Sequence, residues 1–487
     1  MKRKLIIAGS AAIAVLVAGH VGGSWYAGRA VAETMKKQHD WIASLPYFIV
    51  KHHDYQPGWF SSTETTTLQL DPGMYRFLIE REGETLPKIE LTFVNHVQHG
   101  PLPLLGRFNP TPYKAVVTTE FKYTPETEKL LKQFFGDQPP IEIENRIAFN
   151  DDGVMQIRVP AFDYSEAVSG FKAKWGGLDA TLDYGGDFNR VKFSATAPLL
   201  ESSAKGHFNA ALKNLQLNFD NTRGKTGVML GSTALSVESF ALQLEKDTPF
   251  KLQLNKIAYA GKIVEEGEFI NANADITLDK LVLDDQPYGP AVLQAEATHL
   301  HGPTLSKLAT AMTSLQKQQL SSEQFTEALM KLAQTDGMPL LTHDPRLAIT
   351  KLDIKVPDGA VQFTGAVGLK GFKPEDLNNG VQFFKRLDAK ADFKVPRKVA
   401  ETLAIWQFRT LLTGINAQAN QEDIDFLATQ FVEGQIAKLT EQKLLIEENG
   451  MLSAKASLNG GTFVLNGITV PMPWEEGGQP ADEGEAQ

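Results

Sequence analysis

The chain has 487 residues, of which 42% are hydrophobic and 22% are charged, and its formal net charge is −10 at pH 7. These values fit a folded protein of two or three domains, or one very extended domain, and the acidic balance disfavours nucleic acid as a partner. The absence of cysteine excludes disulfides, thiol catalysis, zinc–thiolate sites and lipoprotein processing.

The N-terminus carries a membrane-insertion signal. Three basic residues at 2–4 precede an apolar run, and residues 5–26 would extend roughly 33 Å as a helix, enough to cross a hydrocarbon core of about 30 Å. Trp25 and Tyr26 fit an aromatic belt at the outer interface. We therefore expect residues 1–4 to be cytoplasmic, residues 5–26 to form a single-pass inner-membrane anchor, and the bulk of the chain to be periplasmic.

A cleavable signal peptide is the alternative to this anchor. Ala30-Val31-Ala32 matches the small-residue pattern of a cleavage site. It lies about ten residues beyond the end of the apolar run, farther than a cleavage site normally lies, so we favour retention of the anchor. Residues 27–45 are predicted to continue as a membrane-proximal helix that rises off the membrane and ends before Pro46.

Residues 46–302 are predicted to be rich in β-strands. Short alternating segments flank one helical segment at 124–135, and from residue 207 onward the strands lengthen to about 10–13 residues, twice the usual length. Such strands indicate a long, curved antiparallel sheet with one apolar side that a second sheet, helices or an apolar ligand must cover. The longest segments are 208–219, 233–245, 251–260, 272–283 and 291–302.

Two helical pairs interrupt the β pattern in the second half of the chain. Apolar residues at helical spacing predict a helical hairpin over 303–336. In the C-terminal region, 337–474, strands alternate with helices over 397–412 and 422–448, the second ending at Asn449-Gly450. The acidic tail, 475–487, is predicted to be disordered. The predicted fold class is α+β, mostly β.

The sequence lacks the local signatures of common enzymes, so we expect no catalytic activity. Histidine pairs occur at positions 52 and 53, 96 and 99, and 299 and 301. None is accompanied by further ligands at metal-site spacing, and we expect neither a metal nor a cofactor.

Two segments combine glycine, proline and aromatic residues in an unusual way. Gly58 precedes Trp59 and Phe60, and His99 is followed by Gly100 and Pro101. Glycine permits close backbone approaches, and large rings can lock a corner, so both segments fit structural corners. The alternative is a fixed aromatic lip beside an apolar groove, with Trp59, Phe60 and His99 as binding residues.

In their order after an N-terminal anchor, these segments resemble the YdgA-like family of Gram-negative envelope proteins, which has no established function. The resemblance rests on Tyr55, Gly58-Trp59-Phe60-Ser61-Ser62 and His99-Gly100-Pro101-Leu102, and Pro57 departs from the basic residue expected there. It implies an inner-membrane protein with a periplasmic body and assigns no catalytic residue. Residues 347–371 are also similar to repeats of AsmA-like proteins, whose long sheets enclose a lipid groove.

The leading hypothesis is a non-enzymatic protein of cell-envelope maintenance that binds or conveys a lipid or another apolar ligand in a β groove. Self-association as a homodimer, or binding of a periplasmic protein through the helices of 397–448, is the alternative, and a periplasmic hydrolase is a second one. The residues predicted to line the groove are Leu242, Leu244, Leu252, Leu254, Leu281 and Leu283.

Overall fold

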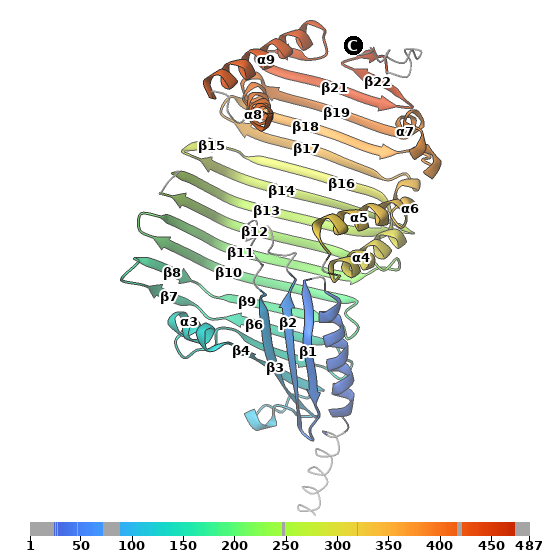
Figure 1. Cartoon of the computed structure of the whole chain (residues 1–487). Coiled ribbons are helices and arrows are strands. Elements are labelled where there is room, and N and C mark those ends of the chain that lie inside the picture. The colour runs from blue at the N-terminus through green and yellow to red at the C-terminus, as the bar shows by residue number, and fades with distance from the viewer. Residues whose placement is uncertain are drawn as a thin grey trace, which may run out of the picture. The chain divides into compact units, whose positions relative to one another are not determined.

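A computed structural model gives the fold, which is mostly β with a few helices (Figure 1). The chain divides into two compact units: the first comprises residues 1–249 and 306–332, the second residues 250–305 and 333–487. The described residues are 24, 26, 28–45, 47–71, 88–245, 249–318, 320–415 and 421–472.

The first unit contains an antiparallel sheet in which the strands pair in the order β1-β2-β3-β4-β5-β6-β9-β10-β11-β12. The short hairpin of β7 and β8 attaches to the other end of β10. The strands are β1 Phe48–Gln56, β2 Ser61–Leu70, β3 Glu90–His99, β4 Ala115–Lys122, β5 Glu142–Ile147, β6 Gly153–Val159, β7 Phe162–Ser165, β8 Phe171–Trp175, β9 Leu178–Tyr184, β10 Arg190–Ala204, β11 Phe208–Arg223 and β12 Met229–Leu244.

The N-terminal helix, residues 28–44 with the helical residues Ser24 and Tyr26 before it, packs on one face of this sheet. Its buried residues recur at spacings of three and four, which places them on one helical stripe. They are Ser24, Gly28, Val31, Thr34, Met35 and Gln38. The predicted helix at 27–45 is present over residues 28–44, and it forms part of the core. Its predicted position next to a membrane stays a prediction.

The core beneath this helix explains the docking. Val31 and Met35 pack against Val97 of β3, Val117 of β4 and Ile147 of β5, all nearly inaccessible to solvent. Fully burying an apolar side chain of this size stabilises the folded state by about 1.5–3 kcal/mol. The helix is thus held by sheet residues that come from three adjacent strands.

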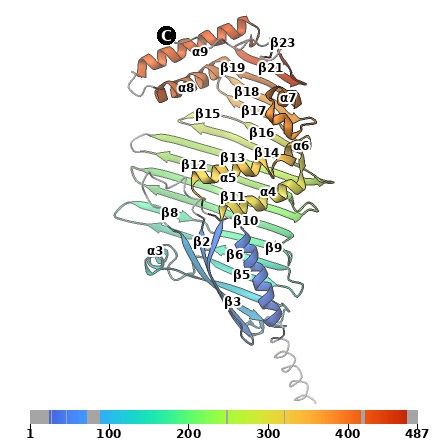
Figure 2. The ribbon, with the colours of Figure 1, turned by 45° about the vertical axis from the view of Figure 1, so that its right-hand side comes forward.

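Three further helices belong wholly or largely to the first unit: α3 Pro125–Phe135, α4 Gly302–Gln316 and α5 Ser322–Gln334. The Thr124 hydroxyl caps α3 by accepting a hydrogen bond from the Thr127 backbone N–H. In both views α4 lies over the long strands of this unit (Figures 1 and 2). Lys317, just after α4, donates a hydrogen bond to the carbonyl of Ala43 at the end of the N-terminal helix.

The second unit is also an antiparallel sheet, paired in the order β13-β14-β16-β17-β18-β19-β21-β22-β23, with β15 beside β14 and β20 beside β21. The elements are β13 Phe250–Glu266, β14 Phe269–Leu283, β15 Gln286–Tyr288, β16 Ala291–His301, α6 Met338–Thr342, β17 Arg346–Val356, β18 Gly359–Leu369, α7 Gly380–Arg386, β19 Leu387–Pro396, α8 Arg397–Ile415, α9 Gln421–Glu441, β20 Ile446–Glu448, β21 Met451–Asn459, β22 Thr462–Leu465 and β23 Ile468–Val470.

The C-terminal helices α8 and α9 run side by side (Figure 2) and pack on β19 and β21 through Val432, Ile436 and Leu452. The predicted extension of the second helix to residue 448 is wrong. Asn449 and Gly450, with φ of 51° and 73°, form the turn of the β20–β21 hairpin. Asn-Gly with two positive φ angles is the preferred two-residue hairpin turn, and it does not cap a helix here.

None of the described helices combines the length and the apolar character needed to cross a membrane. The predicted anchor falls on residues 5–26, of which only Ser24 and Tyr26 are described, and the predicted disordered tail lies outside the described residues. The membrane-spanning prediction therefore stays a prediction.

Candidate functional site

One face of the second unit carries a row of apolar side chains across seven adjacent strands. Residues directly opposite each other on antiparallel strands share a face of the sheet, so the register of the strands places the whole row on one side. We call this set the apolar row: Tyr259, Ile276, Leu293, Leu352, Phe363, Phe393 and Ala454.

A second line of apolar residues runs parallel to the apolar row, two positions along each strand and hence on the same face. Two glycines of this face lie under aromatic rings: Tyr259 covers Gly261, and Phe363 covers Gly365. A side chain at either glycine would displace the ring that lies over it. The second line consists of Ile257, Leu278, Ala291, Ile354 and Val361.

Helices α8 and α9 cover one end of this face. Val395 and Leu452, opposite each other on β19 and β21, lie beneath α8 and α9. Toward β14 the row is more open: Leu293 and Leu352 are half-buried, and Ile276 is exposed. The opposite face of β17–β21 is polar, where Asp353, Gln362, Asp392, Lys394 and Lys455 line a cavity of about 430 Å³.

The structure places the predicted groove residues in two groups. In the second unit Leu252 pairs with Leu283 and Leu254 pairs with Leu281, and all four are half-buried. In the first unit Leu242 and Leu244 of β12 lie opposite Ala210 and Phe208 of β11. The wider apolar row was not predicted, although the alternation over 347–369 and 387–395 carried the signal.

The two motif segments meet at the N-terminal helix. His99 Nε2 lies 3.2 Å from Ser62 Oγ, and His99 Nδ1 lies 3.1 Å from the carbonyl oxygen of Ser24. Ser62 is 3% exposed and His99 2% exposed. Burial lowers the pKa of His99, although the contact with the Ser24 carbonyl opposes the shift. The predicted binding role of His99 stays a prediction, and in this structure the ring is a core residue.

Close contacts leave no room for a side chain at the glycines of these two segments. A β-carbon on Gly58 would collide with the carbonyl of Ser61, and one on Gly100, where φ is 126°, would collide with the Ser24 side chain. Trp59 is 66% exposed and Phe60 is 48% exposed. Pro101 follows Gly100 at the end of β3 and is half-buried.

A buried serine–histidine pair raises the question of hydrolysis. In a catalytic pair a general base activates a nucleophile that the substrate can reach. Here both side chains are nearly inaccessible, and Nδ1 faces a backbone carbonyl in place of a carboxylate. The geometry supports packing of the helix on the sheet and does not present a nucleophile to a substrate.

A polar network beneath the same helix was missed by sequence reasoning. Lys114, which is buried, contacts Asp151 and donates to Thr34 Oγ1 at 2.8 Å, and Thr34 donates to Asp151 Oδ1 at 2.7 Å. Burial acts to raise the pKa of the Asp151 carboxyl, but hydrogen bonds from Lys114 and Thr34 hold it below its usual value.

A second polar group lies farther along the helix. The Tyr184 hydroxyl donates to Asn145 Oδ1 at 2.9 Å and accepts from Gln38 Nε2 at 2.8 Å. Burial raises the pKa of Tyr184 to about 12. Phe188 stacks on Tyr184 on one side and on Trp41 on the other. The pattern of residues along one sequence does not indicate such contacts between distant segments.

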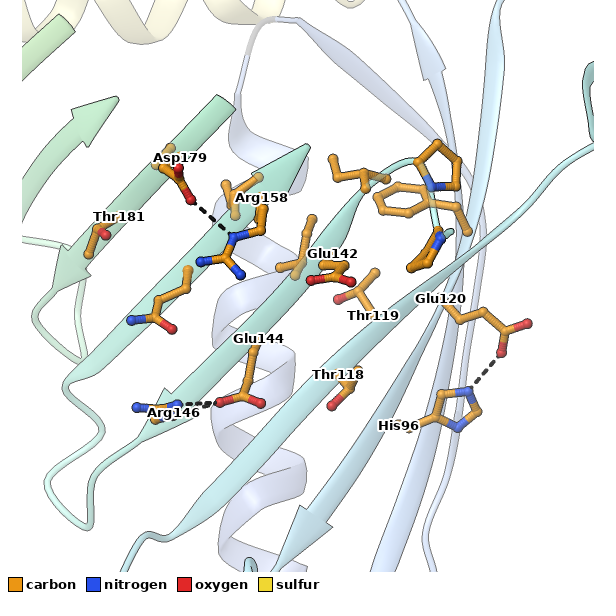
Figure 3. Close-up of a pocket in the computed structure, with 18 of the residues that line it drawn as sticks. His96, Thr118, Thr119, Glu120, Glu142, Glu144, Arg146, Arg158, Asp179 and Thr181 are labelled. Atoms are coloured by element: carbon orange, nitrogen blue, oxygen red, sulfur yellow. Dashed lines mark hydrogen bonds and ion pairs between the residues drawn. The ribbon is translucent and has the colours of Figure 1, made fainter. Parts of the chain in front are cut away.

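The opposite face of this part of the sheet holds a polar cavity of about 830 Å³ (Figure 3). Because Asn145 bonds to the helix, its neighbours Glu144 and Arg146 point to this other face. Most of the charges are paired within the cavity: Arg107 and Arg146 with Glu144, Arg158 with Asp179, and His96 with Glu120. Glu142 also lines it. Such pairing leaves little net charge to select a ligand.

The fold and the site define a class of proteins built on long antiparallel strands, with an apolar sheet face and a helix docked at the N-terminal end. The chain belongs to the family described as bacterial protein of unknown function (DUF945), whose model matches residues 1–473. The chain is similar to Protein YdgA of Escherichia coli (strain K12), with 25% identity over 492 residues that cover 94% of this chain and 93% of that protein. The predicted membership of the YdgA-like family is confirmed.

Proposed function

We propose that this protein is a non-enzymatic, membrane-anchored component of the cell envelope that binds an apolar chain, such as a lipid acyl chain, along the apolar row. The row itself is the observation that carries the proposal. Seven strands contribute to one apolar face, and α8 and α9 cover only one end of it. Each methylene buried against such a face contributes about 0.8 kcal/mol.

The N-terminal helix supports the anchored state. Ser24, Gly28 and Val31 are all buried against the sheet, so cleavage after Ala32 would remove core residues. Retention keeps these contacts, and a helix continuous with the anchor would then hold the body close to the inner membrane, where acyl chains are available.

The test is native mass spectrometry with lipid extraction on the full chain purified from membranes. A stoichiometric lipid or acyl chain is expected in the unmodified protein, and Phe363→Asp, in the middle of the row, should lower its occupancy at least tenfold. Thr364→Asp is the matched control, because Thr364 is the next residue and faces the polar side. A ligand-free protein, or equal occupancy in the two variants, would contradict the proposal.

A second candidate is a scaffold that binds itself or a periplasmic protein through α8 and α9. On these helices Trp406, Phe426 and Leu427 are each more than half exposed, and Trp406 reaches 63%. Large exposed apolar patches are typical of contact surfaces. On the same helices Ile405 packs on the α9 core, and the ring of Phe408 stacks on that of Phe431 with the centroids 4.5 Å apart.

The scaffold is tested by the solution mass of the full chain in a mild detergent. A dimer that Phe426→Asp converts to a monomer, while the neighbouring change Gln430→Asp does not, would favour the scaffold. A monomer at all concentrations would remove self-association.

A further inference from the structure

Three side chains with metal-binding atoms converge beside the N-terminal helix. His39 lies on the helix, His53 on β1 and Glu64 on β2, and one ligand atom from each lies within 4.8 Å of the other two. His53 Nε2 is 2.9 Å from Glu64 Oε1. The two imidazole rings stack with their centroids 3.7 Å apart. Only folding brings these residues together, since they come from three separate elements.

Glu64 is held in the manner of a metal-binding carboxylate. Its side chain is 4% exposed. Its Oε2 atom accepts a hydrogen bond from Asn95 Nδ2 at 2.7 Å, and Asn95 Oδ1 accepts one from Thr119 Oγ1 at 2.7 Å. Hydrogen bonds of this second layer fix the orientation of ligands in metal sites. The other oxygen, Oε1, is thereby directed toward the imidazoles.

A buried carboxylate also requires positive charge nearby, because an uncompensated ion costs several kcal/mol away from water. The amide of Asn95 supplies a hydrogen bond but no charge, and the imidazole of His53 supplies charge only when it is protonated. A divalent cation between Glu64 and the two imidazoles would provide that charge. Access is open, because His53 is exposed at the surface.

We propose that His39, His53 and Glu64 bind one divalent transition-metal ion, with Zn²⁺ as the best match. Two imidazole nitrogens and one carboxylate oxygen form a known zinc ligand set that leaves a fourth position for water, whereas Ca²⁺ and Mg²⁺ prefer oxygen ligands alone. Tetrahedral bonds of about 2.0–2.2 Å place ligand atoms about 3.4 Å apart. In this structure the three ligand atoms lie within 4.8 Å of one another, and the two imidazole rings are stacked. The side chains must therefore draw closer and the rings must turn to hold the ion.

The ion would fasten the N-terminal helix to the β1–β2 hairpin. This role does not depend on the apolar row, and it stands or falls separately from the proposed function. It also differs from the expectation drawn from sequence, which found no partners for the histidine pair at 52 and 53. The missing partners are His39 and Glu64, eleven or more residues away from His53 along the chain.

The test titrates Zn²⁺ alone into the full chain in mild detergent, after removal of metals with a chelator, against a chromogenic competitor. One ion per chain is expected. His39→Gln, His53→Gln and Glu64→Gln should each weaken binding at least tenfold. His52→Gln is the matched control, since this adjacent histidine lies outside the cluster, and it should bind as the unmodified chain does.

A second measurement on the unmodified chain guards against variants that fail to fold. X-ray absorption at the zinc edge should show about two imidazole ligands per ion, and Co²⁺ substitution should give the intense visible bands of a four- or five-coordinate site. Absence of stoichiometric binding, a coordination shell without imidazole, or undiminished affinity in His39→Gln would overturn the proposal.

Discussion

At the scale of single residues, two glycines set how closely the N-terminal helix approaches β3. A β-carbon on Gly28 would lie 2.7 Å from Cε1 of His99. Gly100 has φ in the left-handed region and lies against Ser24. The family motif around His99 therefore forms a steric fit between the helix and the sheet, which explains its composition without catalysis.

The first prediction concerns Gly28. Gly28→Ala should loosen the helix, because overpacking costs about 1–3 kcal/mol and outweighs the gain of about 1 kcal/mol that Ala brings to a helix interior. Hydrogen exchange measured by mass spectrometry should become faster in residues 28–44. Gly434→Ala on α9 is the control, because its β-carbon meets nothing within 4 Å; unchanged exchange in Gly28→Ala would contradict this view of the packing.

The second prediction concerns the protonation of His99. Burial keeps its folded-state pKa below the usual 6.5, so the unfolded chain binds the proton first as the pH falls. Its stabilising contribution is complete above pH 6.5 and decreases toward the folded pKa, by up to about 1.4 kcal/mol per pH unit. Denaturant unfolding should show His99→Gln less stable than the unmodified chain at pH 7.5, with a smaller gap at pH 5.5. A constant gap would mean that His99 does not titrate as a buried neutral ring.

At the scale of elements, the alternation of apolar residues located most strands, but the sequence did not reveal where the N-terminal helix docks. The long strands were located, yet they run to 16 residues in β11 and β12 and 17 in β13, beyond the predicted ends. β10, with 15 residues, was not predicted. The stripe of Val31, Met35 and Gln38 could have revealed a docked helix, but the surface that it contacts comes from strands about 60 to 150 residues away, which one sequence does not identify.

The third prediction concerns the start of the N-terminal helix. A chain that begins at residue 33 lacks Ser24, Gly28 and Val31, whereas one that begins at residue 24 keeps them. Loss of a fully buried valine together with its buried neighbours should lower the free energy of unfolding by about 2–4 kcal/mol. Thermal unfolding should therefore place the shorter chain at a lower midpoint than the longer one. Equal midpoints would show that the body does not need residues 24–32 and would reopen cleavage at Ala30-Val31-Ala32.

At the scale of the whole molecule, the two units differ in how their sheets are covered. In the first unit the N-terminal helix packs on the face that carries Val97, Val117 and Ile147. In the second unit α8 and α9 cover the end of the apolar face at Val395 and Leu452. The mostly β fold class was predictable from alternation. The division into two units was not predictable, because residues 306–332 belong to the first unit although they fall between β16 and β17 of the second unit in the sequence.

The fourth prediction follows from this division. Ile147 and Leu452 are almost completely buried, one in the core of each unit, and replacing either by Ala should cost about 2–5 kcal/mol. If each unit is cooperative by itself, scanning calorimetry of the full chain should resolve two transitions, with Ile147→Ala lowering one and Leu452→Ala the other. An added acyl-chain ligand should raise only the transition that Leu452→Ala lowers, since the apolar row belongs to the second unit. A single transition that both variants shift equally would mean that the sheets unfold as one body, and ligand stabilisation could then not be assigned to either unit.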